Sequence, residues 1–128
     1  MLARALAICL LVVSTAAHAQ APVVAPGARP AYETDLTRLA EILGALHYLR
    51  ELCGAREGQA WRVEMQALLD AEAPSGERRD RLTASFNRGY RGFQQSYRTC
   101  TPAANYAIRR YLEEGSRIAR DVTARYAN

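Results

Sequence analysis

The sequence predicts an all-α protein, a small up-down-up-down four-helix bundle stapled by one disulfide. Three observations support this fold class. Apolar residues recur with a helical period of about 3.6 in four segments. No segment shows the alternation that is typical of a strand. The connections between the segments are short, so successive helices should run antiparallel within one domain of this 128-residue chain.

Residues 1–19 have the order of a cleaved signal peptide. Arg4 lies in a short positive region, residues 5–13 form an apolar run, and residues 17–19 form an Ala-x-Ala cleavage site. The apolar run is too short to cross a bilayer, which needs about 20 residues. We therefore expect a periplasmic protein with no transmembrane segment after cleavage, and an uncleaved anchor is the alternative.

A tether rich in Pro and Ala, residues 20–32, follows the predicted cleavage site. It carries Pro22, Pro26 and Pro30 together with Gly27, and it has no periodic apolar face. This composition predicts an extended, flexible segment. The helical bundle domain then occupies residues 33–128.

Four helices are predicted within this domain. Thr34 suits the N-cap of the first helix, and Gly54 suits the position after its last turn. Pro74 ends the second helix. The third begins near Ser75, and Thr101 caps the fourth with proline in the next position. The inner faces, one for each helix, are Leu36, Leu39, Ile42, Leu43, Leu46, Leu49 and Cys53; Trp61, Met65, Leu68 and Leu69; Leu82, Phe86, Gly89, Tyr90, Phe93, Tyr97 and Cys100; and Ile108, Tyr111, Leu112, Gly115, Ile118, Ala119, Val122 and Tyr126.

Two features of the last two helices carry further expectations. Gly89 lies on the inner face of the third helix, where we expect it to admit the backbone of a neighbouring helix. The outer face of the fourth helix carries charges three or four residues apart, such as Arg110 with Glu114 and Glu113 with Arg117. We interpret those pairs as a solvated surface.

Two cysteines remain after signal cleavage, Cys53 and Cys100, because Cys9 lies inside the apolar run. The first and third helices run parallel in the predicted topology, so both cysteines lie at the same end and on apolar faces. An even number of cysteines in an exported protein favours a disulfide. The chain-entropy model values it at about 4 kcal/mol. Two free buried thiols are the alternative.

Two stretches of the chain resemble a known family. They are residues 39–53 with Trp61 and Met65, and residues 86–93 leading into Tyr97 and Cys100. Together they are similar to the alphaproteobacterial domain-of-unknown-function 2385 family over roughly residues 32–126. The resemblance implies a small exported envelope protein with two paired cysteines, and it implies no catalytic residue.

Several chemistries are missing from the mature sequence. His47 is the one histidine left, at the edge of the first helix's apolar face, and we interpret it as structural. A haem carrier using His47 and Met65 is a weak alternative. There is no zinc-ligand spacing, no phosphate loop, and no Ser-His-acid or Cys-His set. We predict a non-enzymatic protein with no cofactor and no metal.

A basic face is the remaining candidate site. No acid lies between Asp80 and Glu113. The arginines on the third helix opposite its apolar face are Arg81, Arg88, Arg91 and Arg98, and Arg109 and Arg110 follow. The planar guanidinium groups of these arginines suit hydrogen bonding to phosphate and carboxylate groups. The alternative is that these arginines form an ordinary solvated face. All 17 cations of the chain are arginine, which suggests a coding bias rather than selection for binding at this face.

These observations predict an envelope interaction or adaptor module. It would bind an envelope protein or an anionic envelope component through the third helix, and export argues against nucleic acid. The rival is a periplasmic chaperone or an envelope-stress-related bundle. A chaperone would need a concave apolar surface, which helices with one ordinary inner face each do not predict.

Overall fold

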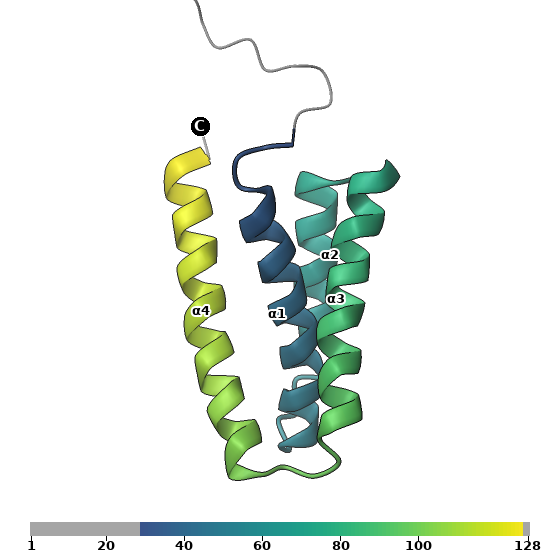
Figure 1. The fold of residues 1–128 in the computed structure, drawn as a ribbon, viewed down its shortest axis with the longest axis vertical. Helices are drawn as coiled ribbons and strands as arrows, with labels where there is room; N and C mark the ends of the chain where they lie inside the picture. The colour runs from purple at the N-terminus through teal and green to yellow at the C-terminus, as the bar shows by residue number, and fades with distance from the viewer. Residues whose placement is uncertain (1–28, 127–128) are drawn as a thin grey trace, which may run out of the picture.

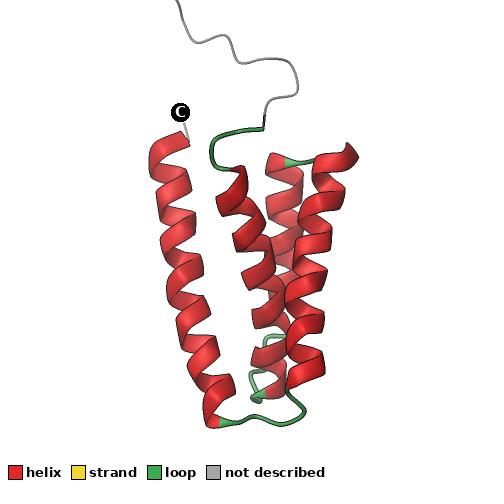
Figure 2. Cartoon of the chain, viewed as in Figure 1, coloured by secondary structure: helices red, strands yellow, loops and turns green. Residues whose placement is uncertain are grey.

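The computed structural model describes residues 29–126, and within that range it contains four helices and no strand. They are α1 (Glu33–Leu52), α2 (Ala60–Glu72), α3 (Gly76–Ser96) and α4 (Pro102–Tyr126). Figure 1 shows that the helices alternate in direction, and Figure 2 shows that short loops join them. The predicted all-α bundle is confirmed. The predicted signal peptide and most of the predicted tether lie outside the described residues.

No helix in the described part of the chain combines the length and the apolar character needed to cross a membrane.

The end of α1 follows the prediction. Gly54 has a φ of +82°, a left-handed conformation that glycine adopts without steric cost. Its N–H donates to the carbonyl of Glu51 at 3.0 Å, and the N–H of Ala55 donates to the carbonyl of Arg50 at 2.9 Å. These two bonds form a Schellman motif, which satisfies carbonyls at the end of the helix.

The helix starts agree with the sequence only in part. Thr101 caps α4, because its Oγ1 accepts a hydrogen bond from the N–H of Ala104 at 3.1 Å. Ser75 occupies the N-cap position of α3 but makes no side-chain cap bond. The prediction for α1 was wrong by two residues: Tyr32 is the N-cap, and Thr34 lies in the first turn. Within the helix, the Thr37 hydroxyl donates a hydrogen bond to the carbonyl oxygen of Glu33, four residues earlier.

α1 is the central helix of the molecule. It packs against α2, α3 and α4, whereas the backbone of α4 approaches that of α1 alone. Figure 1 shows α1 between α4 and the pair formed by α2 and α3. Residues 42–47 are consecutively buried, so α1 has no single inner face. The prediction of one ordinary inner face therefore fails for α1, because its neighbours surround it.

Two apolar clusters lie on either side of α1. The first joins α1 to α2 and α3, and the second joins α1 to α4. The first consists of Leu36, Ala40, Leu43, Met65, Leu69, Ala73, Leu82 and Phe86. The second consists of Ile42, Leu46, Leu49, Ala104, Ile108 and Ile118. Each fully buried Leu or Ile contributes about 1.5–3 kcal/mol, so this double core drives the fold.

The predicted disulfide is present. Cys53, the C-cap of α1, bonds to Cys100, with 2.08 Å between the sulfurs and 4.9 Å between the α-carbons. Cys100 lies in the loop after α3, which ends at Ser96, rather than on the helix itself. The disulfide therefore ties the loop before α4 to the end of α1.

Candidate functional site

A groove of about 690 Å³ lies between α2 and α4, and α1 forms its floor. We call it the α2–α4 groove. The floor is Leu39, Ile42, Leu43 and Leu46; the α2 side is Glu57, Ala60, Trp61, Glu64, Ala67 and Leu68; and the α4 side is Tyr111, Leu112, Gly115, Ser116 and Ala119. The groove exists because α2 and α4 are both held on α1 and their backbones do not approach each other.

The α4 wall is fixed to α1 by an ion pair. The Arg38 guanidinium donates from Nε to Glu114 Oε1 at 2.8 Å and from Nη2 to Oε2 at 3.0 Å. It also lies 5.3 Å from the centre of the Tyr111 ring. Hydrogen bonding to Arg38 lowers the pKa of the Glu114 carboxyl. Glu114 therefore bonds to α1 and is not the purely solvated side chain that the sequence suggested.

The α2 wall is fixed to α1 by the carboxylate of Glu57. Arg50 Nε donates to its two oxygens at 3.0 and 3.1 Å, and Trp61 Nε1 donates to Oε2 at 2.6 Å. Hydrogen bonding to Arg50 is the main cause that lowers the pKa of the Glu57 carboxyl. The Trp61 ring is thereby oriented as part of the groove wall.

The groove surface carries little charge. Among its lining residues the carboxylates are Glu57 and Glu64, and no arginine or histidine lines it. Ala60, Ala67, Ser116 and Ala119 are small and exposed, and Leu112 is 36% exposed. Such a surface can bind an apolar segment, but it offers no paired groups for acid–base or nucleophilic chemistry.

Glu64 is the one acid of this lining that is free to pair. It is exposed, and no cation of residues 29–126 lies within ion-pair distance of it. Glu57 is already bonded to Arg50 and Trp61. The rim of the groove on the α2 side therefore carries one unsatisfied negative charge.

The sequence alone did not predict this groove. Ala60, Ala67 and Ser116 were not among the candidate residues it indicated. The signal available was the presence of Ala60, Val63 and Ala67 beside Glu64 on one flank of α2, because so many uncharged side chains are unusual on an exposed helix surface. Val63 is 62% exposed on that flank.

The predicted basic face of α3 divides into two halves. Nη1 of Arg81 lies 3.3 Å from Oε1 of Glu77, and its Nη2 lies 3.8 Å from Oε1 of Glu33. Nη2 of Arg88 lies 3.6 Å from Oε2 of Glu41 and donates a hydrogen bond to the hydroxyl of Ser85. Thus two of the four arginines bind acids of α3 and α1. Arg91 and Arg98 are exposed, and within residues 29–126 neither has an ion-pair partner. Placing Arg98 on the third helix was wrong, because α3 ends at Ser96 and Arg98 lies in the loop that follows.

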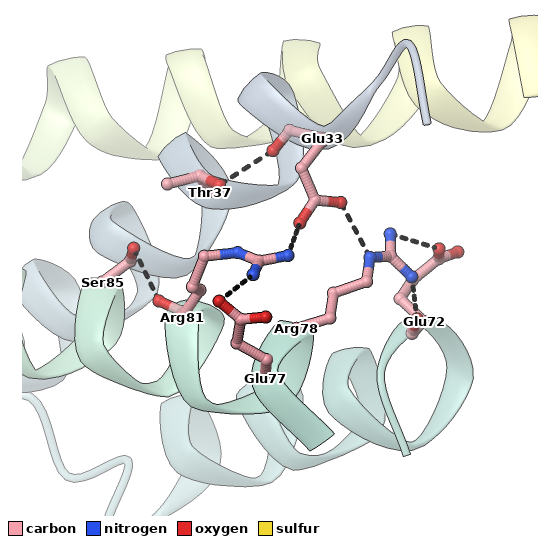
Figure 3. A network of polar contacts seen from close by, with 7 residues as sticks. All are labelled: Glu33, Thr37, Glu72, Glu77, Arg78, Arg81 and Ser85. Carbon is pink, nitrogen blue, oxygen red and sulfur yellow. Dashed lines mark hydrogen bonds and ion pairs between the residues drawn. The ribbon is translucent and has the colours of Figure 1, made fainter. Parts of the chain in front are cut away.

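Arg81 belongs to a polar network at the end of the bundle opposite the disulfide. Figure 3 shows the carboxylate of Glu33 between Arg78 and Arg81. Arg78 Nε donates to Glu33 at 2.8 Å, and its Nη2 reaches the Glu72 carboxylate at 3.4 Å. Glu33 is only 7% exposed, so this network ties the start of α1 to α2 and α3. Its role is structural.

His47 lies inside the bundle rather than in the groove. It is 7% exposed, and its Nδ1 has no hydrogen-bond partner. Its ring centre lies 6.0 Å from that of Phe86 and 5.5 Å from that of Tyr90. Burial, and then the nearby charge of Arg62, lower the pKa of His47. No group of three or more metal-ligating side chains occurs in the described part of the chain.

The fold and the groove define a class of protein: a small helical bundle, stapled by a disulfide, with an apolar interhelical groove. A family model described as a protein of unknown function (DUF2385) matches residues 31–126, and the chain belongs to this family. The resemblance drawn from the sequence is confirmed at the level of the family. No curated protein and no solved structure matches the chain.

Proposed function

We propose that this protein is a non-enzymatic interaction module of the bacterial cell envelope. In this proposal residues 1–19 are a signal peptide that directs export to the periplasm and is then cleaved. The mature protein binds an apolar segment of another envelope component in the α2–α4 groove. The groove, open and lined mostly by uncharged side chains, is the observation that carries the proposal.

The exposed apolar side chains on the groove walls cost free energy in the unbound protein, because they remain in contact with water. Leu112 of α4 lines the groove and is 36% exposed, whereas Ile42, Leu43 and Leu46 of the floor are already buried. Contiguous surfaces of this kind mark binding sites in soluble proteins. A partner that covers the groove would remove this apolar surface from water, which is favourable.

The groove also bears on the choice between the two functional hypotheses, an adaptor and a chaperone. The concave apolar surface expected of a chaperone is present, although the sequence did not predict it. However, surfaces that accept many clients use flexible side chains, methionine above all. Met65 is the one methionine in residues 29–126, and it is 5% exposed. The walls are held by the Arg38 and Arg50 bonds, which favours one defined partner.

The test is photo-crosslinking from Ser116 in intact cells that produce the full chain. A photo-reactive amino acid at Ser116 should join a partner covalently, and mass spectrometry would identify it. The same chain with Ala67→Glu, which places a charge in the groove, should lose the crosslink. Ala84→Glu is the matched control, because Ala84 is an exposed residue of α3. Equal crosslinking in all three chains would contradict the proposal.

A second surface stays a candidate for an anionic partner. Arg91 of α3 and Arg98 of the loop after α3 are exposed without ion-pair partners in the described residues. Changing both to Gln should weaken capture of an acidic envelope component if this surface binds one. The paired Arg88→Gln serves as the comparison, since Arg88 already contacts Glu41.

A further inference from the structure

We infer that the α2–α4 groove is occupied by a single amphipathic α-helix of a partner protein, which carries lysine or arginine on the flank that faces Glu64. This inference rests on the proposed function and names the partner's chemistry at the same site.

The walls of the groove exclude an extended peptide that adds to a sheet. Such peptides bind through the free backbone N–H and C=O groups of an edge strand. Here α1, α2 and α4 form every side, and their backbone groups bond within the helices. An occupant must therefore satisfy its own backbone, and a helix does so.

The exposure of the walls argues against a small molecule. Pockets for small ligands bury about 70–90% of the ligand and place a few polar groups around it. In this groove Ala60, Ala67 and Ala119 are exposed, and the opening runs along both helices. A long apolar stripe would cover this opening better than a compact ligand.

The walls of the groove, rather than its floor, offer contact surface to a partner helix. Ile42, Leu43 and Leu46 of the floor are already buried between the helices, and Leu39 is the floor residue that is only partly buried. The small side chains of Ala67, Ser116 and Ala119 allow a partner helix to approach the walls closely. A helix laid here would contact α2 and α4 together and fill the space that separates them.

The charges favour a basic flank on the partner. The whole chain carries a net charge of +4, yet the charged lining residues of the groove are the acids Glu57 and Glu64. Because Glu57 is bonded to Arg50, Glu64 remains available to a cation from outside. A second copy of this chain would bring another Glu64 into a two-fold interface through the groove, so like charges disfavour self-association there.

The experiment uses two designed 18-residue helical peptides with the same leucine stripe. One carries lysine along one flank and the other carries glutamate. Their affinities for the mature protein, purified from the periplasmic fraction, are measured by fluorescence anisotropy at low salt. The lysine peptide should bind about two- to fivefold more tightly, the range expected for one exposed ion pair. General attraction to this basic protein would give the opposite order.

A charge reversal separates the local effect from the rest. In Glu64→Lys the preference should reverse in favour of the glutamate peptide, while Arg62→Gln on the same helix should leave it unchanged. Equal affinity for the two peptides, or a preference that Glu64→Lys does not alter, would overturn the inference.

Two further measurements distinguish the inference from the proposed function. Ala67→Glu should weaken both peptides at least tenfold, and Ala84→Glu should not. If a partner crosslinks at Ser116 in cells but shows no dependence on Glu64, the proposed function stands and the inference fails. If sedimentation shows a dimer that Ala67→Glu dissolves, a second copy occupies the groove and the inference is wrong.

Discussion

Gly44 of α1 and Gly89 of α3 lie where these two helices cross with their backbones in direct contact. A β-carbon on Gly44 would lie 1.9 Å from the carbonyl oxygen of Phe86, and one on Gly89 would lie 2.0 Å from that of Glu41. Each glycine therefore faces the backbone of the opposite helix, and side chains cannot move aside to relieve the contact. This crossing sets the separation of α1 and α3.

Alanine at either position should push the helices apart. We expect Gly44→Ala and Gly89→Ala each to lower the free energy of unfolding by about 1–3 kcal/mol or more, the range found for overpacked cores. Urea denaturation followed by circular dichroism measures this effect. Gly92→Ala is the control: apart from the chain around it, no atom would lie within 4 Å of a β-carbon on Gly92, so better helix propensity should stabilise the protein by up to about 1 kcal/mol. A loss at Gly92 equal to that at Gly89 would refute the packing argument.

The disulfide should supply a large share of the stability. Cys53 and Cys100 are 47 residues apart, and replacing both with Ser should cost about 4 kcal/mol by the chain-entropy model. Thermal unfolding with and without reductant measures the loss. The native protein should resist a thiol-alkylating reagent until it is reduced. Labelling of both cysteines before reduction would show that the bond is absent.

His47 should make the protein less stable as the pH falls. Burial keeps its folded pKa below the ordinary value near 6.5, so the unfolded chain binds a proton that the folded protein resists. Stability should therefore fall as the pH drops below about 6.5, measured as the denaturation midpoint between about pH 7.5 and 5.5. The charges that act on it are Arg62, which lowers its pKa further, and Glu51, which raises it; its α3 neighbours are Phe86 and Tyr90.

His47→Leu should flatten the pH dependence across that window, and Arg62→Gln should reduce it in part. An unchanged slope in His47→Leu would assign the effect to another group.

The Arg38–Glu114 pair should hold α4 by a modest amount. The two side chains are 34% and 22% exposed, so solvent screens the pair, and Glu114→Gln should cost about 1 kcal/mol or less. Because the folded pKa of Glu114 is lowered, this contribution is present above about pH 4.5 and is lost as the pH falls through the lower folded value. A double-mutant cycle with Arg38→Gln measures the coupling.

Glu113→Gln is the matched control for that cycle, since Glu113 is exposed and forms no ion pair within residues 29–126. Coupling between Arg38 and Glu113 as large as that with Glu114 would reduce the pair to a general charge effect.

The helix ends and the cysteine pairing could be predicted because their causes are local or topological. Gly54 ends α1 through a left-handed turn, and Thr101 caps α4 through its own hydroxyl. Thr34 misled the prediction, since a capping residue type followed by a helical pattern does not show which residue begins the helix. Gly89 was predicted to contact another backbone, whereas its partner Gly44 was not identified.

The basic face shows why the candidate site could be predicted only in part. Helix geometry places Arg81 and Arg88 on one face of α3, but it does not show that Glu33 and Glu41 of α1 lie beside them. Those acids belong to a different helix, far from the arginines along the chain. Pairing across helices depends on their crossing angle and rotation, which no local pattern contains.

By itself, the sequence determined four helices and their order, because helical periodicity and chain reversals are properties of neighbouring residues. It also indicated the disulfide, because alternating helices bring the ends of the first and third helices together. Only the tertiary structure decided that α1 is the central helix and that α2 and α4 remain apart. That choice depends on how closely each pair of helices packs, as at Gly44 and Gly89, and on bonds such as Arg38–Glu114. The α2–α4 groove follows from this packing, so it could be seen only once the helices were assembled.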